Sequence, residues 1–192
     1  QDIVNLEERL RKYGAQPIRS EVCLNELFLN HLASGGSRTR ALLALGAGKE
    51  LGLPNDVRYP IATSVELLHQ ASLIHDDIQD EDTLRRGKAA VWQVAGISSA
   101  ICLGDELIAA AFEELAYIPE PFVKDIPKLT IMLSRGVSVM AAGQTLDCSW
   151  TPSSKTVLED YEDIVRHKSG PLLGLPIAML LTLAGGSDDQ VT

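Results

Sequence analysis

The chain has 192 residues, of which 45% are hydrophobic and 22% are charged, and 17 basic against 26 acidic residues give a formal net charge of −9. A chain of this length and apolar content can bury one substantial core, so we expect a single domain over residues 1–192. The acidic balance disfavours nucleic acid and anionic membrane surfaces as partners.

Cysteines and apolar runs indicate the cellular setting. Cys23, Cys102 and Cys148 are widely spaced and form no metal-ligand pattern, which is typical of free thiols in a reducing cytoplasm. The first residues are polar and do not resemble a signal peptide. The longest apolar run, residues 171–185, is shorter than the roughly 20 residues that a membrane span requires. We therefore expect a soluble, cytoplasmic protein that is not integral to a membrane.

Helical periodicity dominates the chain, and no segment shows the alternation of a strand. A long helix begins near Val57 and ends in an acidic cluster; Gly and Pro residues separate the other expected helices, which cover residues 2–13, 20–33, 38–51, 97–117, 122–148, 156–168 and 172–184. This pattern predicts an all-α bundle of long helices joined by short turns.

The acidic cluster is the most informative stretch of the sequence. Asp76 and Asp80 share a helix face, and Asp77 lies about 100° round the axis, within reach of a shared ion. Clustered carboxylates repel one another unless a cation lies between them. Hard oxygen ligands favour Mg²⁺, whose octahedral coordination is usually completed by substrate phosphates. Arg85 and Arg86 follow at once with donors suited to phosphate. Acidic helix ends are usually solvated surface, but this one closes an apolar segment, so we predict a metal-bridged diphosphate site.

Asp76-Asp77-Ile-Gln-Asp80 followed by Arg85-Arg86-Gly87 resembles the first aspartate-rich motif of the trans-isoprenyl diphosphate synthases, or polyprenyl synthetases. The resemblance extends from Gly35 to Leu183. It implies the isoprenoid synthase fold, in which long, mostly antiparallel helices surround a central cavity. It also implies Mg²⁺ bound by the three aspartates, and a homodimer with residues 97–117 and 122–148 near the interface.

The Gly35-Gly36 turn precedes a helix, whose N-terminal amides favour anions. In the family this turn binds isopentenyl diphosphate through a Lys at the position of Ser37 and an Arg at that of Arg40, so Ser37 removes one cation. The side chains that remain to hold this substrate are Arg38, Arg40, Arg86 and His69. A lone His on an apolar helix is more often a core residue, but the resemblance places His69 on the substrate.

A different group of residues is assigned to the allylic substrate. By resemblance, Arg85 and Lys168 hold the allylic diphosphate, and Gln144 and Ser169 face the reacting carbon. Neutralising the diphosphate promotes its departure, and a dry, apolar pocket protects the allylic cation from water. Without the resemblance, the alternative for Gln144 is a structural role, as a buried amide that is hydrogen-bonded to a neighbouring helix. We interpret Asp105 as structural, the buried partner of an arginine.

The same family carries a second aspartate-rich motif, and nothing after Ser169 matches it, because Asp188-Asp189 has no third Asp. We therefore expect a prenyl synthase domain that is incomplete at its C-terminus. The leading hypothesis is a Mg²⁺-dependent prenyltransferase that condenses an allylic prenyl diphosphate with isopentenyl diphosphate. Two alternatives stay open: a class I terpene cyclase on the same fold, favoured by Ser37, and a non-catalytic partner subunit of a prenyl synthase, favoured by the missing motif.

Product length depends on the floor of the pocket. The family uses the positions of Ala71 and Ser72 as this floor, with aromatic residues there when products are short, and Leu68 lies about one turn deeper. Ala71 and Ser72 are small and leave the pocket open at this depth, whereas bulky side chains there would fill it. We therefore expect a trans-polyprenyl diphosphate of about twenty carbons or longer.

Overall fold

The computed structural model describes residues 1–13, 23–150 and 157–186. Within these ranges eight α-helices, one 3₁₀ helix and one two-stranded hairpin form, which confirms the predicted all-α class. The elements are α1 (Asp2–Leu10), α2 (Leu24–Leu32), α3 (Thr39–Glu50), α4 (Asn55–Gln79), β1 (Leu84–Arg85), β2 (Lys88–Ala89), α5 (Val91–Leu115), η1 (Phe122–Asp125), α6 (Ile126–Ser149), α7 (Val157–Lys168) and α8 (Pro171–Leu183). The Asp188-Asp189 pair lies outside the described residues.

The structure differs from the sequence expectation between α4 and α5. Strands β1 and β2 pair antiparallel around Arg86 and Gly87, whose φ angles are 52° and 80°. Two successive positive φ values suit the tight turns of two-residue hairpins, and strands this short show no alternation in sequence. Helix α5 starts at Val91 rather than 97, because a short helical segment precedes Gly96, where φ is 82° and ψ is 161°.

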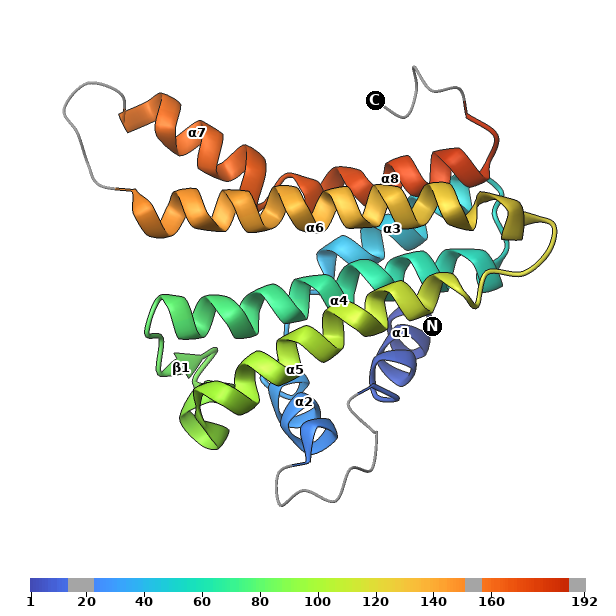
Figure 1. Ribbon diagram of the computed structural model, residues 1–192. Coiled ribbons are helices and arrows are strands. Elements are labelled where there is room, and N and C mark those ends of the chain that lie inside the picture. The colour runs from blue at the N-terminus through green and yellow to red at the C-terminus, as the bar shows by residue number, and fades with distance from the viewer. Residues whose placement is uncertain (14–22, 151–156, 187–192) are drawn as a thin grey trace.

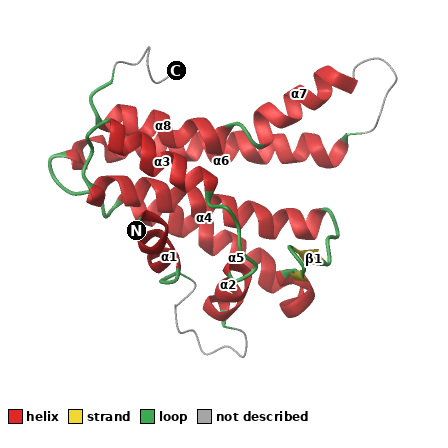
Figure 2. Ribbon diagram, turned by 180° about the vertical axis from the view of Figure 1, so that it is seen from behind, coloured by secondary structure: helices red, strands yellow, loops and turns green. Residues whose placement is uncertain are grey.

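The helices are arranged in layers, as the two opposite views show (Figure 1 and Figure 2). Helix α5 runs back along α4, and α3 and α8 also contact α4. Helix α6 lies above this layer with α7 and α8 beside it, while α1 and α2 lie on the other side. Successive long helices run mostly antiparallel, as α4, α5 and α6 show (Figure 1).

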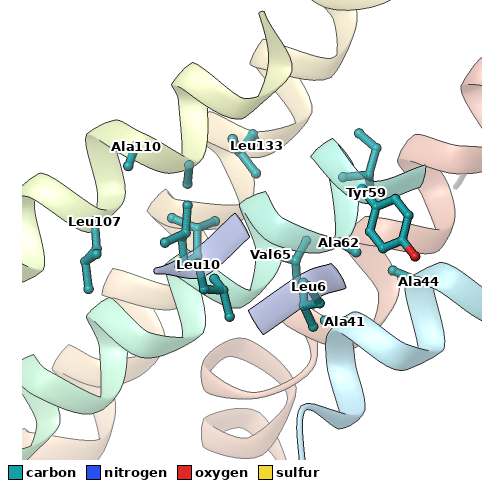
Figure 3. Packing of buried hydrophobic residues seen from close by; sticks show 14 of the residues in the cluster. Leu6, Leu10, Ala41, Ala44, Tyr59, Ala62, Val65, Leu107, Ala110 and Leu133 are labelled. Carbon is teal, nitrogen blue, oxygen red and sulfur yellow. The ribbon is translucent and has the colours of Figure 1, made fainter. Parts of the chain in front are cut away.

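Helix α4 is the centre of the core. Every residue from 57 to 68 is buried, which leaves this half of the helix no solvent face, as expected for a helix enclosed by others. Figure 3 shows the packing around Val65 and Ala62, with side chains from α1, α3, α5 and α6. Because its N-terminal half is fixed in this way, α4 holds its C-terminal turns, with the acidic cluster, in a defined position.

Buried polar contacts attach α1 to the core. Glu114 of α5 is buried and accepts hydrogen bonds from Arg9 Nη2, at 2.5 Å, and from the Tyr13 hydroxyl. Tyr59 of α4 donates to Asp2 Oδ1 at 2.8 Å and accepts from Asn5 Nδ2 at 2.9 Å. The position of α1 is therefore set by two other helices.

One helix in the described part of the chain, α5, is long and apolar enough to cross a membrane, judged by length and composition alone. Its apolar residues form no unbroken run, because Gln93, Ser98, Ser99, Asp105 and Glu106 lie between them. Core helices of soluble proteins pass the same test, and Ala100, Leu103, Leu107 and Ala111 of α5 are buried in the core. The expectation that the protein is not integral to a membrane stays a prediction.

Candidate active site

A cavity of about 680 Å³ lies between α4 and α6. Its walls combine polar and apolar side chains, and residues from the ends of α3, α7 and α8 complete the lining. The lining residues are Arg40, Leu68, His69, Ala71, Ser72, Leu73, His75, Asp76, Gln79, Ile108, Val137, Met140, Ala141, Gln144, Thr145, Cys148, Ser149, Lys168, Ser169 and Leu172. The structure thus brings most of the predicted site residues to one cavity.

The acidic cluster is divided between two environments. Asp76 is half-buried and lines the cavity, and Asp80 is exposed one turn further on. Asp77 is fully buried and accepts hydrogen bonds from Nε of Arg85, at 2.8 Å, and from its Nη2. Asp77 and Arg85 thus neutralise each other in the structure. That the three aspartates share one ion and that Arg85 holds the allylic diphosphate stay predictions.

A metal ion would depend on the two remaining carboxylates. Within residues 1–13, 23–150 and 157–186, no group of three or more His, Cys, Asp or Glu side chains is placed to hold a metal ion. Mg²⁺ does not require such a cage, because it is usually held by one or two carboxylates and completed by water and substrate phosphates. Asp76 and Asp80, with hard oxygen donors at the cavity mouth, fit this mode of binding.

Lys168 faces Asp76 across the cavity. Its Nζ donates to Asp147 Oδ2 at 2.6 Å and lies 3.9 Å from Asp76 Oδ2. Burial lowers the pKa of Lys168, but its hydrogen bond to Asp147 and the charge of Asp76 outweigh this effect, so the pKa lies above its ordinary value. Burial raises the pKa of Asp76, and Lys168 partly opposes this. The ammonium group is thus kept charged beside the carboxylate.

A glycine makes this approach possible. A Cβ on Gly143 of α6 would lie 2.4 Å from the backbone nitrogen of Lys168, so only glycine allows α6 to lie this close to the end of α7. The helix break that follows places Ser169 on the cavity wall. Asp147, which orients Lys168, was not among the predicted site residues, although it belongs to the Gly143-Gln144-x-x-Asp147 segment.

Gln144 presents a polar atom without a partner. Its Nε2 donates to Gln79 Oε1 at 2.7 Å, whereas its Oε1 is buried and accepts no hydrogen bond from the described residues. Its amide carbonyl is therefore available to a positively charged or polar ligand. The residues one turn before and after it, Met140 and Cys148, also line the cavity, and this spacing of four residues was a signal that the sequence analysis did not use.

The Gly35-Gly36 turn lies beside the hairpin. Arg86 Nη1 donates to the Gly35 carbonyl, and Arg40 Nη1 lies 3.2 Å from His69 Nε2. Arg40 and His69 line the cavity, whereas Ser37 is exposed and its hydroxyl bonds that of Thr39 at 2.6 Å. These positions keep Arg40, Arg86 and His69 at one end of the site.

Two expectations about single residues are wrong. Arg38, expected to help hold a diphosphate, is buried and paired with Glu7 and Glu66. Asp105, expected to be the buried partner of an arginine, is exposed and lies 3.9 Å from His75 Nε2. The ring of His75 fills the space over Gly104, where a Cβ would lie 2.1 Å from Nε2, so Asp105 is turned outwards.

The predicted floor residues do line the cavity. Leu68, Ala71 and Ser72 follow one another down α4, away from Asp76. Ile108 of α5 and Met140 of α6 line the cavity with them. Leu172 of α8 lines it as well, so the apolar part of the cavity is built from four helices rather than from α4 alone.

Comparison with known proteins places these features in a family. A family model described as "Polyprenyl synthetase" matches residues 21–192. A heterodimeric geranylgeranyl pyrophosphate synthase large subunit of Arabidopsis thaliana is 34% identical over 93% of this chain and 50% of its own length. A farnesyl diphosphate synthase of Geobacillus stearothermophilus is 33% identical over 97% of this chain and 64% of its own.

The fold is matched by solved structures as well. A polyprenyl synthase of Caulobacter crescentus, solved with calcium and isoprenyl diphosphate, has a TM-score of 0.84 and 27% identity over 99% of this chain and 55% of its own. The chain therefore spans roughly half to two thirds of the length of the relatives it matches.

Two buried histidines predict the acid sensitivity of the fold. Burial lowers the pKa of His69 to about 3 and that of His31 to about 4, against about 6.5 in an unfolded chain. Below pH 6.5 the unfolded chain binds protons that the folded chain does not, so stability is lost as pH falls, by about 1.4 kcal/mol per pH unit for each histidine.

Replacing one of them should reduce this loss. In His69→Gln, which keeps an acceptor for Arg40, the free energy of unfolding measured in urea should fall less between pH 7 and pH 5 than in the wild type. Between pH 8 and pH 9 both histidines are neutral in the folded and in the unfolded chain, so the stabilities of the two proteins should change in parallel there. Equal losses in the acid range would contradict the buried, neutral state of His69.

Proposed function

The chain belongs to the polyprenyl synthetase family, and from this membership we propose that the protein is a Mg²⁺-dependent prenyltransferase. It joins an allylic prenyl diphosphate to isopentenyl diphosphate. The observation that carries the proposal is the cavity below Asp76, which has Lys168 at its mouth, Arg40 and His69 along one side, and an apolar floor.

Departure of the allylic diphosphate is the first chemical step. The C–O bond breaks and leaves an allylic cation, so charge develops on the diphosphate and must be neutralised. Lys168 provides one fixed positive charge, and Mg²⁺, held by Asp76 and Asp80 together with substrate oxygens, supplies the rest when bound. Arg85 serves indirectly, since its bonds to Asp77 hold the hairpin against α4.

The cation left behind is protected by its surroundings. Leu68, Ile108 and Met140 contribute to the apolar part of the cavity, which would keep water away from the cation once both substrates fill the site. The unpaired carbonyl of Gln144 and the hydroxyl of Ser169 offer negative dipoles without an anionic nucleophile.

The second substrate, isopentenyl diphosphate, is held by a different group of residues. Arg40 and Arg86 bind its diphosphate, and neutral His69 accepts from Arg40 and orients it. The double bond of isopentenyl diphosphate attacks the cation, a C–C bond forms, and a proton is lost. With its pKa lowered to about 3 by burial, His69 is too weak a base for this proton, so the released diphosphate accepts it.

A condensation assay tests the function. Incubated with radiolabelled isopentenyl diphosphate, an allylic primer and Mg²⁺, the protein should form a labelled, longer prenyl diphosphate. Asp76→Asn should lower kcat by about 100-fold or more, because a ligand of the Mg²⁺ that would neutralise the departing diphosphate is lost.

Glu81→Gln, which removes an exposed carboxylate outside the cavity, is the matched control and should change kcat little. Consumption of the primer without incorporation of label would contradict condensation and favour a terpene cyclase. Activity only after addition of a second synthase would favour a partner subunit instead.

Product length should respond to the cavity floor, and we propose a product of about twenty carbons or longer. Phe at both Ala71 and Ser72 adds bulk to a packed site that cannot absorb it, so the double variant should release a shorter chain, identified by chromatography of the dephosphorylated product. Leu43→Phe, on the exposed side of α3, should leave the length unchanged. An active double variant with unaltered product would show that the chain does not grow past these residues.

We also propose a homodimer formed through α5 and α6. Ile97 and Ile101 lie one turn apart on α5 and are exposed, as are Ile131 and Val139 on α6, and a second copy would remove these apolar side chains from water. Light scattering should give about twice the chain mass of 20.8 kDa, and Ile97→Glu with Ile101→Glu should reduce it to the monomer. A monomeric mass for the wild type at micromolar concentration would contradict the proposal.

A further inference from the structure

We propose that Arg38 is a positioning residue: tied to Glu7 of α1 and Glu66 of α4, it fixes the Gly35–Arg40 turn that binds the second diphosphate without contacting that substrate itself. The inference rests on the proposed function for the identity of the ligand. Its structural part depends only on contacts within the chain.

Arg38 is held on all sides. Its side chain is 2% exposed, Nε donates to Glu7 Oε1 at 2.7 Å, and Nη1 donates to Glu66 Oε1 at 3.2 Å. Nη2 lies 3.5 Å from the carbonyl of Leu32, at the end of α2. All three guanidinium nitrogens therefore have partners within the chain, which leaves the group no role in binding a ligand.

The backbone of Arg38 explains what these contacts fix. Arg38 precedes α3 with φ 50° and ψ 29°, a left-handed conformation that few residues with a side chain adopt. Such a conformation persists only when surrounding contacts hold it. Two residues later, Arg40 enters the cavity, so the backbone at Arg38 determines the direction in which Arg40 points.

Arg38 also contributes to the packing of the turn. A Cβ on Gly36 would lie 3.2 Å from Arg38 Nη1 and 2.7 Å from Arg86 Nη1. The backbone of the turn thus lies directly on two guanidinium groups, one buried and one at the surface. A displaced Arg38 would alter the support of Gly36 and the place where Arg86 meets the Gly35 carbonyl.

The charge of Arg38 is matched by its surroundings. Glu66 is 1% exposed and also accepts from Gln70 Nε2 at 2.5 Å, and Gln70 Oε1 lies 2.9 Å from His31 Nε2. Since burial keeps His31 neutral, with its pKa lowered to about 4, Arg38 is the cation that offsets Glu66. Removing one member of such a buried pair leaves the other uncompensated.

Glu7 is the accessible end of this network and the best place to test it. Its side chain is 28% exposed, and α1 is attached to the core independently by Arg9 and Tyr59. Glu7→Gln should therefore fold, while it weakens the charge-assisted bond to Arg38. Glu8→Gln makes the same chemical change at an exposed neighbour on α1 and is the matched control.

Two measurements on the whole chain decide the proposal. In hydrogen–deuterium exchange, the amides of Gly35 and Leu42, which donate to the carbonyls of Leu32 and Arg38, should exchange about tenfold faster in Glu7→Gln, as expected when one charge-assisted hydrogen bond is weakened, and at the wild-type rate in Glu8→Gln. In titration calorimetry, the Kd for isopentenyl diphosphate should rise about 2- to 30-fold in Glu7→Gln, the range for residues that act on a site without touching its ligand. The Kd for an allylic diphosphate should be unchanged.

Arg38→Lys should reproduce the effect of Glu7→Gln, because one ammonium group cannot reach both carboxylates with the geometry of a guanidinium. Equal exchange rates in Glu7→Gln and Glu8→Gln would overturn the proposal, and so would equal rises of Kd for both substrates. If the wild type binds no isopentenyl diphosphate, the proposed function fails, and the exchange comparison still decides the role of Arg38.

Discussion

The packing of α5 along α4 is the contact on which the remaining structure depends. It buries α4 over its first half and leaves the last turns to meet the cavity, so apolar packing and the polar site share one rigid helix. Gly104 of α5 and His75 of α4 extend this contact towards the site. The ring of His75 occupies the space that a side chain at position 104 would need. The direction of Asp76, one residue later, thus follows from core packing, and a well-packed core transmits small displacements rather than absorbing them.

Buried acids in this chain are paired with arginines from distant segments. Glu114 meets Arg9, Glu66 meets Arg38 and Asp77 meets Arg85. Unpaired, each carboxylate would carry a large desolvation penalty, so each pair requires two elements to meet at a defined place. Asp76 is different: its nearest cation, Lys168, is 3.9 Å away and is bonded to Asp147 instead. The carboxylate at the cavity mouth is the one left available to a ligand.

Sequence patterns predicted the helices well and the partners of single side chains less well. Periodicity and Gly–Pro breaks located the helices, because helix formation depends on local spacing. The spacing of Asp76, Asp77 and Asp80 described which face each occupies but could not show that Arg85 folds back onto Asp77. That contact depends on a six-residue hairpin whose two turn residues have positive φ angles. Arg38 was misjudged for the same reason: its partners, Glu7 and Glu66, lie 31 and 28 residues away.

The hairpin between α4 and α5 joins the two halves of the site. Arg85 bonds Asp77 on one side, and its neighbour Arg86 bonds the Gly35 carbonyl on the other. Under the proposed function, a diphosphate bound by Arg86 would also perturb the turn that carries Arg85. Any effect of one ligand on the affinity for the other would then be the same factor in both directions. Two adjacent arginines on one tight turn thus give α4 and the Gly35-Gly36 turn one shared attachment point.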